Sequence, residues 1–279
     1  MANEVTITVA SSAAPTIVEK EALRAMYAAR VIARPGVVMY DVRTGKPGQN
    51  VDHIELGTLN VNAPGADGTV TNTAVTHTQR QIVLDDWRHV ALSVPYRTLA
   101  QSVFDYDVEF GKAAGGALGA DMDSLVTALQ GSFTTNVEGS SAAIMSDALV
   151  RAAILDLDTG NVLQENRTFV LHPKAKFELL GDSDFRNANA TGMGKGGQVS
   201  GILHPLYGVK FVTSTGVVNS SGRQNLLLQE EAVGFAIQRD INIKKHELVG
   251  DLTTRYTADF LAGVNILRET FAARITTAA

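Results

Sequence analysis

The chain comes nearest to a chemical motif between Gly192 and Gly197, where it reads GMGKGG. These residues satisfy the G-x-G-x-x-G pattern of dinucleotide-binding loops. The pattern binds a pyrophosphate only between a strand and a helix, because the first amides of the helix supply the donors. Here polar residues 184–191 precede the glycines, and a strand-like run at residues 198–203 follows them. The context therefore predicts a surface loop, and a nucleotide-binding enzyme that uses this loop is kept as an alternative.

Other candidate motifs are also incomplete. His246 and Glu247 begin like a zinc-protease motif, but Gly250 stands where the second histidine must lie one helical turn further on. Ser214 lacks the first glycine of a nucleophile elbow. The histidines are scattered, so surface or capping roles are expected for all six: His53, His77, His89, His172, His204 and His246. We expect no catalytic, cofactor-binding or metal-binding residue, and no enzymatic activity.

Two pairs of neighbouring carboxylates could in principle serve acid and base chemistry. Asp85 and Asp86 are adjacent, and Asp105 is followed closely by Asp107. Acidic residues at a turn and at the N-terminus of a helix have a structural purpose, because they are exposed or complement the helix dipole. We therefore interpret both pairs as structural.

The composition excludes several classes of function. A formal charge of −5 argues against affinity that depends on neutralising many phosphates. The chain has no cysteine, so disulfides and thiolate ligands are absent. No apolar run approaches the roughly 18 residues of a membrane span, and the N-terminus lacks a secretory pattern. Because 45% of the residues are hydrophobic, the sequence predicts a globular protein with a substantial core.

The first part of the chain is predicted to contain a helix and a projecting hairpin. Residues 15–33 have an amphipathic pattern that begins at Pro15. The strand predicted at residues 75–84 is largely polar on both faces until Ile82. Such a strand has little core to bury in, so we expect a long hairpin that projects from the body. Its turn is expected in residues 63–68, which are rich in turn formers.

Residues 102–130 are predicted to form a long helix of about 40 Å. A pattern resembling a capping box runs from Ser102 to Asp105. The apolar stripe consists of Phe110, Ala114, Leu118, Met122, Leu125 and Leu129. Four glycines oppose the helix at about 1 kcal/mol each, namely Gly111, Gly115, Gly116 and Gly119. Either close packing stabilises this helix, or the helix bends at the glycines.

The second part of the chain is predicted to mix helices and strands and to end in strands. Residues 146–157 have a helical pattern, and residues 168–171 a strand pattern. A short helix should begin at His172 and Pro173. Further strands are predicted at residues 226–228, 233–237 and 253–266. The whole chain is therefore expected to belong to the α+β class.

This order of elements resembles the major capsid proteins of tailed bacteriophages, which have the Hong Kong 97-type fold. Residues 15–33 resemble the N-terminal arm, and residues 102–130 the spine helix. The stretch GILHPLYGVKFVTSTG, from Gly201 to Gly216, resembles a strand, a tight turn and a second strand of the axial domain. The resemblance implies an arm at 1–40, an extended loop at 41–96, a peripheral domain with the spine helix at 97–143, an axial domain at 144–231, and peripheral return strands at 232–279.

The resemblance also implies a function. A capsid protein of this kind would assemble through pentamers and hexamers into an icosahedral shell around double-stranded DNA, which it would contact weakly and without sequence specificity. Its expected location is the virion, after assembly in the host cytoplasm, with no membrane and no cofactor involved. A portal and a decoration protein are expected partners. An encapsulin-like shell around protein cargo is the alternative within the same structural class.

Two further expectations concern processing. The arm helix is predicted to begin at Pro15, which leaves no room for the long cleaved segment that some relatives carry, so a separate scaffolding protein is expected. Some relatives also cross-link their subunits through a lysine of the extended loop. Lys46 is the only lysine between Asp41 and Pro95, and it lies near the base of the loop, so no covalent cross-link is expected.

Overall fold

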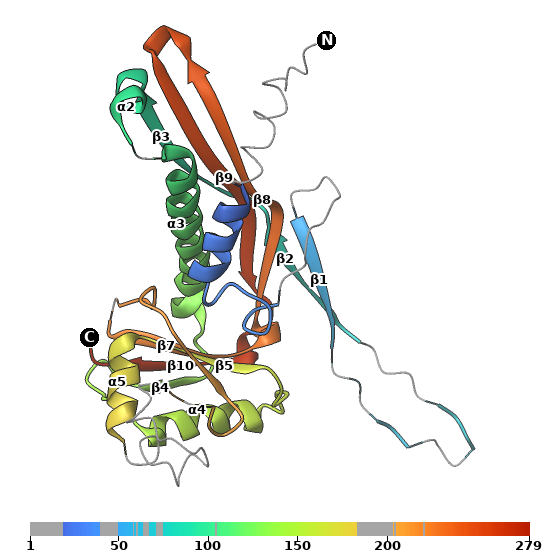
Figure 1. Ribbon diagram of the computed structural model, residues 1–279. Coiled ribbons are helices and arrows are strands. Elements are labelled where there is room, and N and C mark those ends of the chain that lie inside the picture. Colours follow the sequence, from blue (N-terminus) through green and yellow to red (C-terminus); the bar gives the residue numbers. More distant parts are fainter. Residues whose placement is uncertain are drawn as a thin grey trace, which may run out of the picture.

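The structure is a computed structural model, and its described part has an α+β architecture. It describes residues 19–39, 50–57, 59, 61–63, 67–70, 75–103, 105–182, 203, 205–219 and 221–279. Figure 1 shows an upper unit with a three-stranded sheet, a lower unit with a five-stranded sheet, and a two-stranded hairpin that projects to one side. Among the described residues, no helix combines the length and apolar character needed to span a membrane. The glycine-rich loop between Gly192 and Gly197 lies outside the described residues, as does Lys46.

The upper unit is an antiparallel sheet covered on one face by two helices (Figure 1). Its strands are β3 (Asp86–Pro95), β9 (Thr253–Ile266) and β8 (Val233–Leu248), in that order. The covering helices are α3 (Tyr106–Ala128) and the helix at residues 19–29, and α2 (Tyr96–Gln101) follows β3. Along β9, Tyr256, Ala258 and Phe260 alternate with more exposed residues, so one face of the sheet forms the core beneath α3.

Helix α3 has the predicted stripe but begins later than predicted. Five residues of the stripe are buried, and Leu129 packs against the core from the short 3₁₀ helix η1 (Leu129–Ser132). The capping box at Ser102 is wrong, because Ser102 is the C-cap of α2. The N-cap of α3 is Asp105, whose carboxylate accepts hydrogen bonds from the main-chain N–H groups of Asp107 and Val108. A carboxylate satisfies these first amides directly and complements the helix dipole.

The N-terminal helix ends earlier than predicted. Residues 19–29 are helical, whereas residues 31–37 form turns, and residues 15–18 lie outside the described part. The cause is Asp123 of α3, which is 4% exposed. Its carboxylate accepts hydrogen bonds from the N–H groups of Val31, Ile32 and Ala33 at 2.7, 2.9 and 2.8 Å. Because these amides bind a side chain of another helix, the chain leaves its own helical hydrogen-bond pattern here.

The lower unit is a mixed sheet with two helices. Its strand order is β4 (Val137–Gly139), β10 (Ala272–Thr277), β7 (Arg223–Gln229), β5 (Arg167–Leu171) and β6 (Lys210–Thr213). Helices α4 (Asp147–Thr159) and α5 (Pro173–Gly181) pack on a core that includes Leu157, Phe169 and Leu179. As predicted, α5 begins at Pro173 after His172. The strand predicted at residues 168–171 is β5, and the structure shows it buried along its whole length.

Two strands pair differently from what their position in the chain indicates. β3 lies within residues 41–96, which were assigned to the extended loop, yet it pairs with β9 along its whole length. β10 lies within the predicted peripheral return strands, yet it is inserted between β4 and β7 of the lower sheet. In the stretch from Gly201 to Gly216, Tyr207 and Gly208 have positive φ and form the expected turn before β6. The strand expected before that turn falls mostly outside the described residues.

Candidate functional site

The projecting hairpin is the part of the described structure that makes the least use of the molecule's own core. β1 (Asn50–Leu56) pairs antiparallel with β2 (His77–Val83), from Asn50 opposite Val83 to Leu56 opposite His77. Figure 1 shows the pair leaving the body beside β8. Of the seven residues in β2, only Ile82 is buried, which confirms the prediction of a strand with two mainly polar faces. A two-stranded ribbon without a core of its own is marginally stable in water.

One face of this hairpin carries exposed apolar side chains. Ile54 is 65% exposed, Leu56 is 56% exposed and Val83 is 44% exposed, and all three share the face that points away from the body. Beyond the strands, Val61 and Val70 are 100% and 82% exposed. A group of exposed apolar side chains on a projecting element is typical of a surface that binds another protein. The hairpin is therefore the candidate functional site.

The base of the hairpin is attached firmly to the body. Ile82 and Leu84 form a small buried cluster with Ala236 and Leu267, against which Met39 and Val51 pack. The side-chain amide of Asn265 donates a hydrogen bond of 2.7 Å to the main-chain oxygen of Gln81. The hairpin thus leaves the body from a fixed base.

Two glycines of α3 explain how the N-terminal helix packs against it. A Cβ at Gly115 would overlap the main-chain oxygen of Ala22, and a Cβ at Gly119 would lie 2.8 Å from that of Met26. Gly116, by contrast, would meet nothing within 4 Å. Close packing is therefore confirmed as the reason for Gly115 and Gly119, and α3 continues as one helix past all of them.

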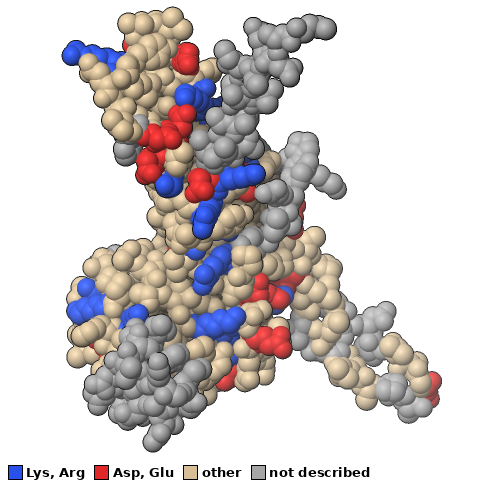
Figure 2. All heavy atoms as spheres, in the orientation of Figure 1, with Lys and Arg blue, Asp and Glu red and all other residues tan. Residues whose placement is uncertain are grey.

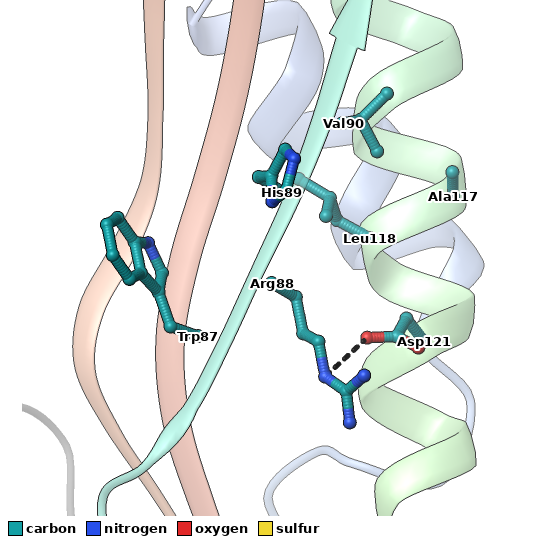
Figure 3. Close-up of a pocket in the computed structure, with 7 residues that line it drawn as sticks. All are labelled: Trp87, Arg88, His89, Val90, Ala117, Leu118 and Asp121. Carbon is teal, nitrogen blue, oxygen red and sulfur yellow. Dashed lines mark ion pairs between the residues drawn. The ribbon is translucent and has the colours of Figure 1, made fainter.

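A shallow hollow of about 440 Å³ lies between β3 and α3 (Figure 3). The close-up shows Val90 and Leu118 between the two elements, Ala117 on the outer side of α3, and the ion pair between Arg88 and Asp121 at the end of the hollow. The Arg88 Nε atom lies 3.8 Å from Asp121 Oδ2, and both side chains are more than a third exposed. A pocket this open does not shield a reaction from water, so its geometry supports contact with another surface rather than catalysis.

Trp87 lies on the side of β3 that faces away from α3 (Figure 3). It is 68% exposed, and its indole N–H donates a hydrogen bond of 3.1 Å to Asp259 on β9. The same Asp259 oxygen lies 3.3 Å from Arg239 Nη1. The position of Trp87 marks a second exposed face of the upper unit, which the sequence analysis did not identify. The available signal was the only tryptophan of the chain, in a strand rich in polar residues.

The charged side chains are mixed rather than gathered. On the face seen in Figure 2, basic side chains lie at intervals down the middle of the molecule, with acidic side chains beside them. Interspersed charges of both signs give a weak field at a distance. This distribution agrees with the net charge in arguing against tight nucleic-acid binding through this face.

The histidines do not form a chemical site in the described part of the chain. His172 has a capping role, as expected for some of them, because its Nδ1 accepts a hydrogen bond of 3.1 Å from the N–H of Lys174. Burial and the nearby cations Arg223 and Lys174 lower the pKa of His172, which favours the neutral form that this bond requires. Four others occupy four different strands, and His204 is outside the described residues: His53 on β1, His77 on β2, His89 on β3 and His246 on β8.

The remaining candidates from the sequence have structural partners. His246 and Glu247 lie on an extended strand, so a helical zinc motif is excluded there. Ser214 accepts a hydrogen bond from the N–H of Gly216 within a turn. Asp107 forms an ion pair of 3.0 Å with Lys245, next to the N-cap of α3. Within the described ranges, no group of three or more His, Asp or Glu side chains is placed to hold a metal ion.

This chain is similar to known proteins in structure but not in sequence. No family model matches this chain, and no curated protein sequence matches it either. Among solved structures, the capsid of Ralstonia phage GP4 aligns with a TM-score of 0.73 at 13% identity, covering 91% of this chain and 90% of that chain. The capsid of cyanophage P-SCSP1u aligns with a TM-score of 0.69 at 16% identity, covering 86% and 87%. This chain has the Hong Kong 97-type capsid fold.

Helix α3 lies within residues 102–130, for which the sequence indicated a resemblance to the spine helix, and the β1–β2 hairpin lies within residues 41–96, for which it indicated a resemblance to the extended loop. A virus-like particle from Pyrococcus furiosus also aligns, with a TM-score of 0.63 at 15% identity, covering 92% of this chain and 97% of that chain. The Hong Kong 97-type fold is thus matched over nearly the full length of several shell-forming structures. The exposed apolar face of the hairpin is a surface of this fold that a partner could cover.

Proposed function

We propose that this chain is the major capsid protein of a tailed phage. It assembles through pentamers and hexamers into an icosahedral shell that encloses double-stranded DNA. The observation that carries the proposal is a hairpin that projects from the body and exposes Ile54 and Leu56, within a fold that aligns over 91% of the chain with the GP4 capsid. An element of this kind is stable where a neighbouring subunit covers it.

The geometry of a closed shell requires contacts of this type. Copies of one chain that form rings must join through heterologous surfaces, so that one surface of each subunit binds a different surface of the next. The hairpin supplies one such surface away from the body. The exposed sheet face around Trp87 and the hollow beside Arg88 are further surfaces of the same subunit. Several neighbours can therefore contact one chain at once.

The charge of the chain suits a container for nucleic acid. With a net charge of −5, the wall confines DNA while contacting it weakly and without sequence specificity. The shell would assemble in the host cytoplasm and remain in the virion. Its proposed partners are a separate scaffolding protein, a portal and a decoration protein. The chain acts as a structural protein rather than as an enzyme.

Electron microscopy of the purified chain tests the proposal. We expect closed shells with pentamers at the five-fold vertices and hexamers between them, formed alone or together with the scaffolding protein from the same genome. A chain that stays monomeric at high concentration, even with that scaffolding protein, would contradict the proposal. Denaturing gels of the particles should show one monomer band, because no covalent cross-link is expected.

A second candidate function is an encapsulin-like compartment. The alignment with the Pyrococcus furiosus virus-like particle keeps a second shell type in view, but its TM-score of 0.63 is below the 0.73 of the GP4 capsid, so this candidate has less support. The contents of particles purified from the native source distinguish the two. Nuclease-protected DNA of genome length supports the capsid, whereas a packaged protein without DNA supports the compartment. Calorimetric binding of a nucleotide by monomers would instead support the enzyme that uses the loop between Gly192 and Gly197.

A further inference from the structure

Arg268 joins the hairpin to the body through three contacts. Its Nε atom lies 2.9 Å from Glu55 Oε1 on β1, and its Nη1 atom lies 2.8 Å from Glu231 Oε2 in the short 3₁₀ helix η2 (Glu230–Ala232). Its guanidinium carbon stacks 4.8 Å from the centre of the Phe271 ring. One side chain therefore forms an ion pair with a carboxylate of the hairpin and a hydrogen-bonded ion pair with a carboxylate of the body at the same time.

The backbone around Arg268 is itself fixed. The N–H groups of Leu267 and Arg268 both donate to the main-chain oxygen of Ala232, at 3.0 and 3.2 Å. Phe271 packs against the cores of both the upper and the lower unit. Arg268 thus stands at the junction of the two units, and its main chain is held by contacts that do not involve Glu55.

Glu55 lies well away from the base of the hairpin. The packed base includes Val51, which precedes Glu55 by four residues on β1. At a strand rise of 3.3 Å per residue, Glu55 lies about 13 Å from Val51 along the strand. Val51 and Glu55 point to the same face, because side chains alternate along a strand. The base acts as a pivot and the ion pair as a second attachment. At about 13 Å from the base, a change of about 1 Å in the distance between Arg268 and Glu55 corresponds to a tilt of the hairpin by about 4°.

The strength of this attachment comes from the combination of contacts. Arg268, Glu55 and Glu231 are 25%, 33% and 39% exposed, so solvent screens each ion pair, and either one alone contributes little. A guanidinium that binds two carboxylates and stacks on a ring loses little further freedom for each contact. Lysine carries the same charge on a single nitrogen, so it cannot place separate nitrogens near Glu55 and Glu231 while a planar group stacks on Phe271.

We propose that Arg268 is the positioning residue that sets the angle between the β1–β2 hairpin and the body, and thereby the curvature of the assembled shell. The second half of this inference rests on the proposed function. Without Arg268 the hairpin turns about its base, so neighbouring subunits meet at varying angles. Shells of mixed diameter then replace a single size.

The test measures the hairpin angle directly and the shell size separately. Because the chain has no cysteine, Val61→Cys and Ala120→Cys create two unique sites for spin labels, one beyond the hairpin strand and one on α3. Electron–electron distance distributions are recorded for doubly labelled chains diluted with unlabelled chains. The variants are Arg268→Gln, Arg268→Lys, and Arg239→Gln as the control, because Arg239 is a partly exposed arginine paired with Asp259 away from the hairpin.

We expect the distance distribution of Arg268→Gln to broaden and shift, that of Arg268→Lys to broaden less, and that of Arg239→Gln to match the parent. Electron micrographs should show a wider range of shell diameters for Arg268→Gln, with partial recovery in Arg268→Lys. An unchanged distribution in Arg268→Gln would overturn the positioning role, whether or not shells form. A broadened distribution with shells of parental size would overturn the link to curvature. If neither the parent nor any variant forms shells, the proposed function is contradicted. The distance distributions of the unassembled chains then still decide whether Arg268 sets the hairpin angle.

Discussion

Gly115 of α3 lies directly against the main-chain oxygen of Ala22 in the N-terminal helix, leaving no space for a Cβ. The neighbouring Gly116 faces open space, with no atom within 4 Å of an added Cβ. Two adjacent glycines with the same helix propensity therefore have opposite environments. This contrast separates the packing role of the α3 glycines from any role in bending.

Replacing Gly115 by Ala should destabilise the protein, whereas replacing Gly116 by Ala should stabilise it. In Gly115→Ala the methyl group forces two backbones apart, and overpacking of this kind costs about 1–3 kcal/mol. In Gly116→Ala the helix gains propensity of up to about 1 kcal/mol with no clash. Urea unfolding of the unassembled chain, followed by circular dichroism, measures both changes. Equal effects of the two substitutions would contradict the assignment.

Gly116→Ala also tests whether α3 bends during a change of shell form. If compact and expanded shells differ by a bend at the glycines, this variant strengthens the straight helix without disturbing a neighbour. Its shells should then expand at a lower temperature than parental shells. Expansion at the same temperature would eliminate the bending hypothesis.

Replacing Asp123 by Asn should loosen the N-terminal helix from α3. The buried carboxylate accepts three main-chain hydrogen bonds, and Asn would place an N–H₂ group against at least one of these donors. We expect a loss of about 1–3 kcal/mol in the free energy of unfolding. Asp121→Asn is the control, because its partly exposed ion pair with Arg88 spans 3.8 Å and contributes little. Similar losses in both variants would show that the three hydrogen bonds are not the cause.

The stability of the parent should decrease in acid through Glu269. The Oε1 atom of Glu269 accepts hydrogen bonds from the N–H and hydroxyl groups of Thr134 and Thr135, at 2.8 to 3.1 Å. These bonds, first of all that from the Thr134 N–H, lower its pKa below the ordinary value of 4.5. Because the folded pKa is the lower one, the contribution is complete above pH 4.5 and is lost as pH falls through the lowered pKa.

Glu269→Gln isolates this effect from the other carboxylates. The parent should be more stable than Glu269→Gln at neutral pH, and the difference should shrink as the pH falls below 4.5. Urea unfolding of both proteins over a pH series gives the comparison. A difference that stays constant across the series would argue against a proton-linked contribution from Glu269.

Replacing Ile54 and Leu56 together by Ser should weaken assembly while leaving the subunit folded. Both side chains are more than half exposed, so the free energy of unfolding should change by no more than about 0.5 kcal/mol. Sedimentation should show that the double variant begins to assemble at a higher subunit concentration than the parent. Gln79→Ser, directly opposite Ile54 on the same face, is the control and should assemble like the parent. Unaltered assembly of the double variant would exclude this hairpin face as a contact surface.

The sequence by itself determined which faces of the elements meet water. The stripe of α3, the polar hairpin with Ile82 as its buried exception, and the capped start of α5 at His172 were all predicted. These features are local, because periodicity and capping depend on residues within a few positions of one another. The resemblance in element order added the overall fold, which the structural alignments confirm.

Only the tertiary structure decided which elements the buried faces meet. A local pattern shows that β10 is a strand but not that it lies between β4 and β7. Likewise, nothing near Gly115 in the sequence indicates Ala22, and nothing near Arg268 indicates Glu55. Ala22 and Glu55 lie about a hundred residues or more along the chain from Gly115 and Arg268. Long-range packing selects them through the shape and charge of surfaces that exist only once the elements have formed.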